Sequence, residues 1–255
     1  MQMKNVAIIP ARMDSTRFPG KPMEKIFDIP MIGHVYYRTK LAKGANLVCV
    51  ATCDKIIYDY IVGIGGCAIM TSSTQERATD RASEALAKIE KINNINYENV
   101  AMIQGDEPLL NPNDINMAFC ELENNKALNI VNLMSDINTS NDFFDKNIVK
   151  VVTDIHGDAL YFSREPIPHK ADEISRNAQT GLIFFKRDYL IHYNSMVQTP
   201  LEIIESIDMM RVIENGDSVR MLKITGNNIG VDTKEDLLTA KRLMESDMFL
   251  KQYLN

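Results

Sequence analysis

Few residues in this chain are of the kinds that bind transition metals or form disulfides. There are four cysteines and four histidines among 255 residues. Cys49 and Cys53 form a C-x3-C pair, but no second pair stands at a metal-ligand spacing and the histidines are scattered. We therefore do not expect a zinc site, and we interpret the cysteines as buried, reduced thiols.

Long apolar runs and an excess of positive charge are also lacking. No stretch approaches the roughly 18 apolar residues that a transmembrane helix needs. The first residues, MQMKNVAII, contain no run of small residues ending in a cleavage site. Lys and Arg total 28 against 34 Asp and Glu, which gives a net charge of −6. We therefore expect a cytoplasmic protein that binds neither nucleic acid nor a membrane.

What the sequence does contain is enough apolar material for a core, arranged in alternating patterns. It is 45% hydrophobic and 24% charged, which is typical of a globular protein. Short β-branched runs predict buried strands, and helical spacing of apolar residues between them predicts helices. The predicted strands are 6–9, 47–51, 100–103 and 130–133, and the predicted helices are 31–42, 55–62, 79–89 and one from Asn113 or Asp114 to Glu123. This alternation predicts an α/β fold with a mainly parallel sheet and helices on both faces.

The pattern changes between about residues 135 and 187. Segments 149–154 and 159–163 flank His156-Gly157-Asp158, which predicts a turn between antiparallel strands. Segment 180–185 is a further strand candidate, and helical patterns return at 200–214 and 233–246. Since no repeat or linker is evident, we predict a single domain over residues 1–255 with a β-rich insertion at about 135–187.

The motif PARMDSTRFPGKP, residues 10–22, directly follows the first predicted strand. An α/β sheet binds its ligands beyond the carboxyl ends of its strands. Backbone N–H groups together with Arg12, Arg17 and Lys21 would suit a polyphosphate at that place. The spacings of the Walker A loop and of the dinucleotide-binding fingerprint are both absent. We predict a phosphate-binding loop, with a solvated basic loop as the alternative.

Two aspartates occupy positions that would suit a metal ion. Asp106 follows a predicted buried strand within Gln104-Gly105-Asp106-Glu107-Pro108. Magnesium prefers one or two protein carboxylates, completed by phosphate oxygens and water. Asp106 is the expected ligand, and Glu107 is as consistent with an exposed turn as with a ligand. Asp232, in Gly230-Val231-Asp232-Thr233, precedes a predicted helix, so its alternative role is to cap that helix.

These motifs, with DIPMIGHV, MIQGDEPLL, IVKVVTDIHGDALYFSREPIP and IGVDTKEDL, resemble those of the 3-deoxy-manno-octulosonate (KDO) cytidylyltransferases over nearly the whole chain. The resemblance implies a Rossmann-like, glycosyltransferase-A-like nucleotidyltransferase fold. It further implies an Mg²⁺-dependent homodimer that joins CTP to a small sugar acid and releases pyrophosphate. The β-rich insertion would then supply the dimer contact. The pathway served, whether for outer-membrane saccharide, capsule or a secondary metabolite, stays open.

The same resemblance implies roles for individual residues. Asp106 and Asp232 would hold Mg²⁺, and Lys21, Arg17 and Asp106 would form the catalytic set. The nucleotide-binding residues would be Pro10, Ala11, Arg12, Arg17, Lys21, Arg77, Ala78, Arg81 and Gln104. The acceptor-binding residues would be Gln104, Arg164, Gln179, Ile183, Asp208 and Met209.

The chain departs from the family pattern where substrates are recognised. Residues 74–81 read TQERATDR where the family has DHQSGTER, so Arg77-Ala78 replaces the Ser-Gly pair near the cytosine. The family's HLGIY and LEQLR are QTGLI at 179–183 and IDMMR at 207–211. Each hydrogen-bonding partner lost from a site costs roughly 1–3 kcal/mol. We therefore hypothesise that KDO itself is excluded and that the enzyme activates a different, less hydroxylated acceptor.

Two other readings stay open. One is a nucleotidyltransferase of the same fold that uses a phosphonate or a sugar phosphate as acceptor. The other is a catalytically silent relative that binds nucleotide. The presence of both Asp106 and Asp232, together with Arg17 and Lys21, argues against the silent reading, because a silent protein has no need of two metal carboxylates.

Overall fold

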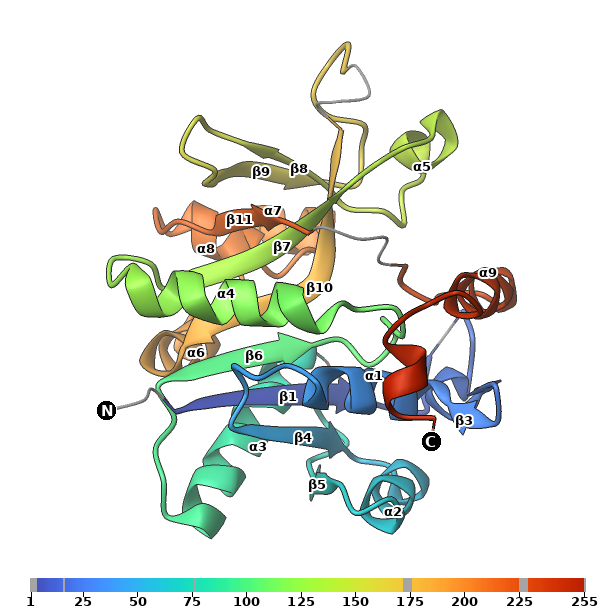
Figure 1. Cartoon of the computed structure of the whole chain (residues 1–255). Coiled ribbons are helices and arrows are strands. Elements are labelled where there is room, and N and C mark those ends of the chain that lie inside the picture. The colour runs from blue at the N-terminus through green and yellow to red at the C-terminus, as the bar shows by residue number, and fades with distance from the viewer. Residues whose placement is uncertain (1–3, 16, 76, 172–175, 225–228, 255) are drawn as a thin grey trace.

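The computed structural model describes residues 4–254 except 16, 76, 172–175 and 225–228. Thr16 and Glu76 of the motifs above, and the first three residues of the chain, therefore lie outside the described residues. The described part forms one nine-stranded sheet whose main path runs β11-β7-β10-β6-β1-β4-β5 (Figure 1). The strands are β1 (Asn5–Ala11), β4 (Leu47–Thr52), β5 (Cys67–Met70), β6 (Asn99–Ile103), β7 (Ile130–Asp136), β8 (Lys150–Thr153), β9 (Ala159–Ser163), β10 (Asn177–Lys186) and β11 (Arg220–Lys223).

The sheet is mixed because one central strand runs against its neighbours. β1 is parallel to β4 and β6, β4 to β5, and β7 to β11. β10 is antiparallel to both β6 and β7. The predicted strand 180–185 therefore belongs to the middle of the main sheet, not to the insertion. Its run from Thr180 to Phe185 is buried throughout, as a strand covered on both faces requires.

The β8–β9 hairpin is the part of the predicted insertion that stands apart from this path. It is antiparallel, as the turn at His156-Gly157-Asp158 predicted, and Gly157 adopts a positive φ of 85° there. β8 pairs with Asn177 and Ala178 at the start of β10, so the hairpin hangs from the long central strand. A separate short pair, β2 (Lys25–Ile26) and β3 (Ile29–Pro30), follows the loop at residues 10–22.

Helices cover both faces of the sheet, which confirms the predicted α/β class. The face that carries Ala7 and Ile9 packs against α1, α2 and α4, and the face that carries Val6 and Ile8 packs against α3, α6 and α8. The alternation follows from the period of two along β1. The helices are α1 (Met31–Lys40), α2 (Lys55–Gly63), α3 (Ala78–Asn93), α4 (Pro112–Asn124), α5 (Ser140–Phe144), α6 (Arg187–Ser195), α7 (Pro200–Glu205), α8 (Met210–Glu214) and α9 (Lys234–Met244).

Two helix predictions are corrected. α4 is capped by Asn111, whose side chain accepts from the Asn113 amide at 2.9 Å, because Pro112 is best placed at the first helical position. Segment 200–214 is not one helix. It breaks after α7, where Ser206 adopts a left-handed φ of 55°, and helix resumes at α8. The residues between the two helices, among them Asp208, are thereby presented from a turn.

A small apolar cluster joins the C-terminal region to the loop at residues 10–22. Phe18 and Ile26 pack there with Val231 and with Ala240 and Met244 of α9. This packing holds the segment that carries Asp232 beside the loop. No helix in the described part of the chain is long and apolar enough to cross a membrane.

Candidate active site

The site lies where the adjacent parallel strands β1 and β6 end. β1 ends at Ala11 and β6 at Ile103, so the loop at residues 10–22 and the segment from Gln104 to Asp106 meet at one edge of the sheet. Gly105 makes this approach possible, since a Cβ there would lie 3.0 Å from the carbonyl oxygen of Pro10.

Lys21 is bound by both predicted metal carboxylates. Its Nζ lies 2.7 Å from Asp106 Oδ2 and 3.0 Å from Asp232 Oδ1, and it also donates to the Val231 carbonyl at 2.8 Å. The Val231 amide in turn donates to the Asp106 carbonyl at 2.8 Å. This backbone bond brings together two aspartates that are far apart in the sequence.

The electrostatics of Lys21 keep it charged. Burial alone would lower its pKa, but the charges and hydrogen bonds of Asp106 and Asp232 outweigh burial and raise the pKa above its ordinary value. Arg17 adds a second cation, with its Nη2 2.9 Å from Asp232 Oδ2 and its Nη1 2.7 Å from Asn147 Oδ1. The predicted catalytic set, Lys21, Arg17 and Asp106, is thus assembled in one place.

Asp232 does not serve as the cap of α9. Thr233 caps that helix, accepting from the Asp236 amide at 3.2 Å, while the Asp236 carboxylate accepts from the Thr233 amide at 2.8 Å. This reciprocal arrangement is a capping box. The Asp232 carboxylate is therefore left to bind the cations of the site.

The donor set fits a divalent cation. Because one ammonium touches Asp106 and Asp232 at once, the two carboxylates lie close enough to bind one metal ion together. Within the described ranges no group of three or more His, Cys, Asp or Glu could hold a metal. The protein would supply two carboxylate ligands, and phosphate oxygens and water would complete the coordination, as Mg²⁺ prefers.

A cavity of about 350 Å³ opens over this edge, and it brings the predicted nucleotide residues together. Arg12 projects from the exposed part of the loop. Arg81 is almost fully buried, and its guanidinium donates to the carbonyls of Ser72 and Gln75 at 3.3 and 3.1 Å, so it shapes the loop before α3. Residues that line the cavity include all nine predicted ones: Pro10, Ala11, Arg12, Arg17, Lys21, Arg77, Ala78, Arg81 and Gln104.

A second, larger cavity of about 1200 Å³ adjoins the first. Of the residues predicted to bind the acceptor, it is lined by Gln104, Arg164, Gln179, Ile183 and Asp208. Met209 is different, since its side chain is fully buried in the hydrophobic core. The prediction that Met209 contacts the acceptor is therefore wrong, because successive residues of the turn before α8 point in different directions. The two cavities share Arg17, Arg77, Ala78, Gln104, Asp106 and Asp232.

The larger cavity is called the acceptor cavity below, after the residues predicted to bind the acceptor, and many of its polar side chains are bonded to the protein itself. Gln179 Nε2 donates to Asn132 Oδ1 at 2.6 Å. The Arg164 guanidinium donates to the carbonyls of Glu205 and Ser206 at 2.8 and 3.3 Å. Asp208 binds Arg77 and Thr79. These three side chains of the cavity wall are thus held by partners within the protein.

Sequence reasoning missed Lys150, which supports this wall, and left the burial of Glu107 undecided. Lys150 is fully buried, and its Nζ donates to three carbonyls, those of Asp145, Ile148 and Arg164, at 2.5–2.8 Å. A single lysine inside the apolar run IVKVV was the available signal. Glu107, for which the sequence left an exposed turn as an alternative, is buried and accepts a hydrogen bond from the Gly181 amide.

Fold and site together define a nucleotidyltransferase. A family model described as cytidylyltransferase matches residues 6–224. Curated relatives match over almost their whole length, and the chain belongs to the cytidylyltransferase family. Members of this family are generally metal-dependent, in keeping with the paired carboxylates.

The relatives carry a more particular name. The 3-deoxy-manno-octulosonate cytidylyltransferase of Geobacter metallireducens is 41% identical, covering 92% of this chain and 95% of its own. That of Fusobacterium nucleatum is 40% identical, with 92% and 94% covered. Among solved structures, a CMP:2-keto-3-deoxy-manno-octonic acid synthetase complexed with CTP is 33% identical, with a TM-score of 0.86 and 95% and 98% of the two chains covered. A cytidylyltransferase from Leptospira borgpetersenii, 18% identical with a TM-score of 0.65 and 96% and 88% covered, shares the fold.

Proposed function

We propose that this enzyme transfers the cytidylyl group of CTP to KDO, giving CMP-KDO and pyrophosphate. The observation that carries the proposal is that Lys21, in the smaller cavity, is bound by Asp106 and Asp232, which line both cavities. A nucleotide in the smaller cavity and an acceptor in the larger one would meet at this point. The relatives' names supply the identities of both substrates.

On the nucleotide side, the cations act on the triphosphate. Arg12, Arg17 and Lys21 come from one loop, and the amides of that loop add further donors. Their charges would neutralise the developing charge on the leaving pyrophosphate, which is where such transfers need stabilisation. Lys21, freed from the carboxylates, would turn its ammonium to the phosphates. The reacting oxygen of the acceptor attacks the α-phosphorus, so positioning supplies much of the acceleration.

We propose Mg²⁺ as the metal. Asp106 and Asp232 would hold it, and when bound it would lower the pKa of an acceptor hydroxyl and neutralise charge on the phosphates. Lys21 holds the two carboxylates at a spacing that suits one cation. The experiment is to measure Mg²⁺ binding in the presence of CTP by calorimetry, where Asp232→Asn should abolish the metal-dependent heat but leave the folded state intact.

On the acceptor side, the structure weakens the hypothesis that KDO is excluded. Met209, one of the changed positions, lies in the core and takes no hydrogen bond away from the cavity. Gln179 binds Asn132 and stays polar at the wall. Ile183 remains as a loss of a polar group in the cavity. Since relatives about 40% identical are named for KDO, we propose KDO as the acceptor.

The test is pyrophosphate release with Mg²⁺, using each of the four NTPs with KDO, other ulosonic acids, sugar phosphates and small phosphonates. We expect release with CTP and KDO and little with any other pair. Release with a different acceptor alone would support the hypothesis based on the sequence departures. A protein that binds CTP but releases no pyrophosphate with any acceptor would support the silent reading.

We also propose a cytoplasmic homodimer. Apolar side chains are strongly exposed on the β8–β9 hairpin, at Ile155 and Leu160, and on α7, at Ile203 and Ile204, and burying them against a second copy would remove them from water. The four cysteines are unpaired, which favours a reducing compartment. Sedimentation velocity should give a dimer, and Ile204→Glu should shift it toward monomer.

A further inference from the structure

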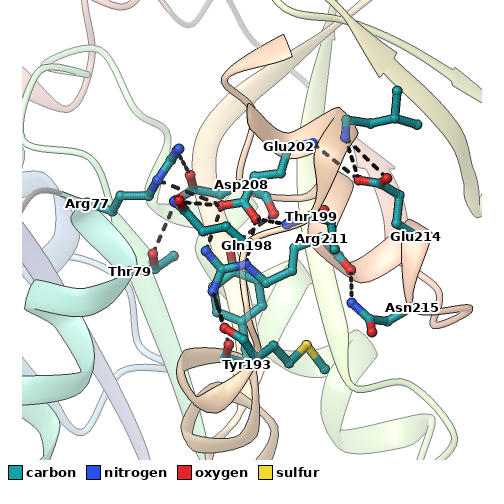
Figure 2. A network of polar contacts seen from close by, with 12 residues as sticks. Arg77, Thr79, Tyr193, Gln198, Thr199, Glu202, Asp208, Arg211, Glu214 and Asn215 are labelled. Carbon is teal, nitrogen blue, oxygen red and sulfur yellow. Dashed lines mark hydrogen bonds and ion pairs between the residues drawn. The ribbon is translucent and has the colours of Figure 1, made fainter. Parts of the chain in front are cut away.

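A partly buried network of charges joins the loop before α3 to the turn between α7 and α8 (Figure 2). Arg77, which directly precedes α3, donates from Nη1 to Asp208 Oδ1. The Thr79 hydroxyl donates to the other carboxylate oxygen of Asp208 at 3.2 Å. Both oxygens of Asp208 are therefore bound by residues at the start of α3, a segment that lines the nucleotide cavity.

A second ion pair lies behind the first and fixes it. Glu202 is fully buried, and its carboxylate accepts two hydrogen bonds from Arg211, at 2.7 and 2.6 Å. Arg77 Nε lies 3.7 Å from Glu202 Oε1. Two guanidinium groups thus face two carboxylates, and their charges balance. The Tyr193 hydroxyl donates to the Asp208 carbonyl at 3.0 Å, which holds the turn in place.

Arg77 lies at the point where the two cavities meet. It lines both of them, whereas Asp208 lines the acceptor cavity and not the nucleotide cavity. The side chains of Arg77 and Asp208 are 25% and 19% exposed, so the pair forms part of the accessible wall. Burial raises the pKa of Asp208, and the Arg77 charge works against that rise.

The pairing of Arg77 with Asp208 determines which polar groups face an acceptor at this wall. Asp208 was predicted to bind the acceptor directly, and each of its oxygens already accepts one hydrogen bond, from Arg77 or from Thr79. Arg77 has spare donors, because among the described residues no partner is found for its Nη2. A guanidinium N–H is therefore presented beside the carboxylate that was expected there.

We propose that Arg77 determines acceptor specificity: its ion pair with Asp208 aims the guanidinium at the acceptor cavity, where it donates a hydrogen bond to an oxygen of the acceptor. This inference rests on the proposed function. It also reassigns Arg77, which the sequence resemblance placed with the nucleotide. The side chain reaches toward Asp208, which belongs to the acceptor cavity, so we expect the acceptor and not CTP to sense its loss.

The experiment compares steady-state constants of the wild-type enzyme with Arg77→Ser and Arg77→Lys. For Arg77→Ser we expect the KM for KDO to rise about tenfold or more, as loss of a charge-assisted hydrogen bond predicts. The KM for CTP and kcat should change less than about threefold. Arg77→Lys keeps the positive charge but loses the planar, forked donors of the guanidinium. Its KM for KDO should therefore lie between those of the wild type and Arg77→Ser.

A substrate series locates the bond. Monodeoxy analogues of KDO, each lacking one hydroxyl, should include one that costs the wild-type enzyme about tenfold in kcat/KM and costs Arg77→Ser less than about twofold. Arg220→Ser is the matched control. It breaks an arginine pair with Asp158 of similar exposure that lines neither cavity, and it should leave both KM values unchanged.

Equal increases in the KM for CTP and for KDO would overturn the proposal, and so would deoxy penalties that are the same in wild type and Arg77→Ser. Calorimetric CTP binding by each variant shows whether it is folded. If Arg77→Ser does not fold, Arg77→Lys with the same analogues decides the question. Failure of the wild-type enzyme to use KDO at all would count against the proposed function, and the Arg77 variants would then be compared with the acceptor that does support release.

Discussion

The smaller nucleotide cavity and the larger acceptor cavity are two halves of one cleft, and their polar side chains are held in different ways. In the nucleotide half, Lys21 and Arg17 bind the carboxylates of the site itself, at Asp106 and Asp232. In the acceptor half, the polar side chains bind each other or the backbone, as Gln179 does with Asn132. A phosphate can take a cation from a carboxylate without disturbing the fold. The side chains that line the acceptor half make bonds that also support the fold, so specificity and stability are linked in that half.

The largest effect should follow from breaking the nucleotide half at its centre. Asp106→Asn removes one charge of the paired carboxylates, and we expect kcat to fall by about a hundredfold or more. The fold should persist, since Lys21 keeps Asp232 and the Val231 carbonyl as partners. Pyrophosphate release gives kcat and circular dichroism checks the fold. Asp59→Asn, which alters an exposed helix pair with Lys55, is the control, and wild-type turnover in Asp106→Asn would remove Asp106 from the site.

In the acceptor half, the corresponding break should show first as lost stability. Glu202→Gln leaves Arg211 and part of Arg77 without their buried carboxylate. Removing one partner of a buried ion pair costs about 3 kcal/mol or more. Urea unfolding should show this loss in the free energy of unfolding, against a change near zero for Lys55→Ala at the surface. An unchanged unfolding midpoint would show that the network does not hold this half together.

A pH test probes the packing behind the nucleotide half, where Ile26 belongs to the apolar cluster that holds the Asp232 segment beside the loop. His34, on α1, is fully buried; it donates from Nε2 to the Ile26 carbonyl at 2.7 Å, and its Nδ1 lies 2.9 Å from the Tyr253 hydroxyl. Burial lowers its pKa from 6.5 to about 4. As the pH falls, the unfolded chain therefore takes up a proton on His34 before the folded chain does. The contribution of His34 to the free energy of unfolding is complete above about pH 6.5 and is lost as the pH falls toward 4.

Between pH 7 and pH 5 the contribution of His34 should fall by about 2 kcal/mol. The measurement is urea unfolding of the wild type and of His34→Gln at both pH values. The difference between the two proteins should shrink at pH 5, because the variant has no such group to titrate. A difference that stays constant with pH would show that the pKa of His34 is not lowered.

The smallest effect is expected from the exposed rim of the nucleotide half. Arg17→Ala removes a cation whose side chain is 48% exposed, and its bond to phosphate is partly screened by water. We expect the KM for CTP to rise about fivefold and the KM for KDO to stay within about twofold. Lys126→Ala, an exposed cation that lines neither cavity, is the control. A larger change for KDO than for CTP would assign Arg17 to the acceptor.

The same division explains what could be predicted from the sequence. Asp106 follows one predicted strand and Lys21 ends the loop that follows another, so their meeting at one sheet edge follows from the rule for α/β sheets. Asp232 precedes a predicted helix, and the rule does not place it. The direct contact between Lys21 and both carboxylates does not follow from that rule. It depends on the backbone bond between Val231 and Asp106, which joins distant segments.

The acceptor half was harder to predict because its side chains come from irregular or central elements. An apolar run at 180–185 indicates a buried strand, but it says nothing of neighbours or direction, and β10 is antiparallel to both of its neighbours. Helical spacing over 200–214 hides the break at Ser206. That break decides that Asp208 faces the cleft while Met209 enters the core. Strands as short as β5 and β11 leave little pattern to detect.

The central claim is that the two halves meet so that CTP and KDO react at Lys21, Asp106 and Asp232. The most direct measurement is the mass of the products formed from CTP, KDO and Mg²⁺. The account predicts CMP-KDO and pyrophosphate in equal amounts, with neither formed by Asp106→Asn at a comparable rate. Unchanged CTP and KDO, with both shown to bind, would contradict it.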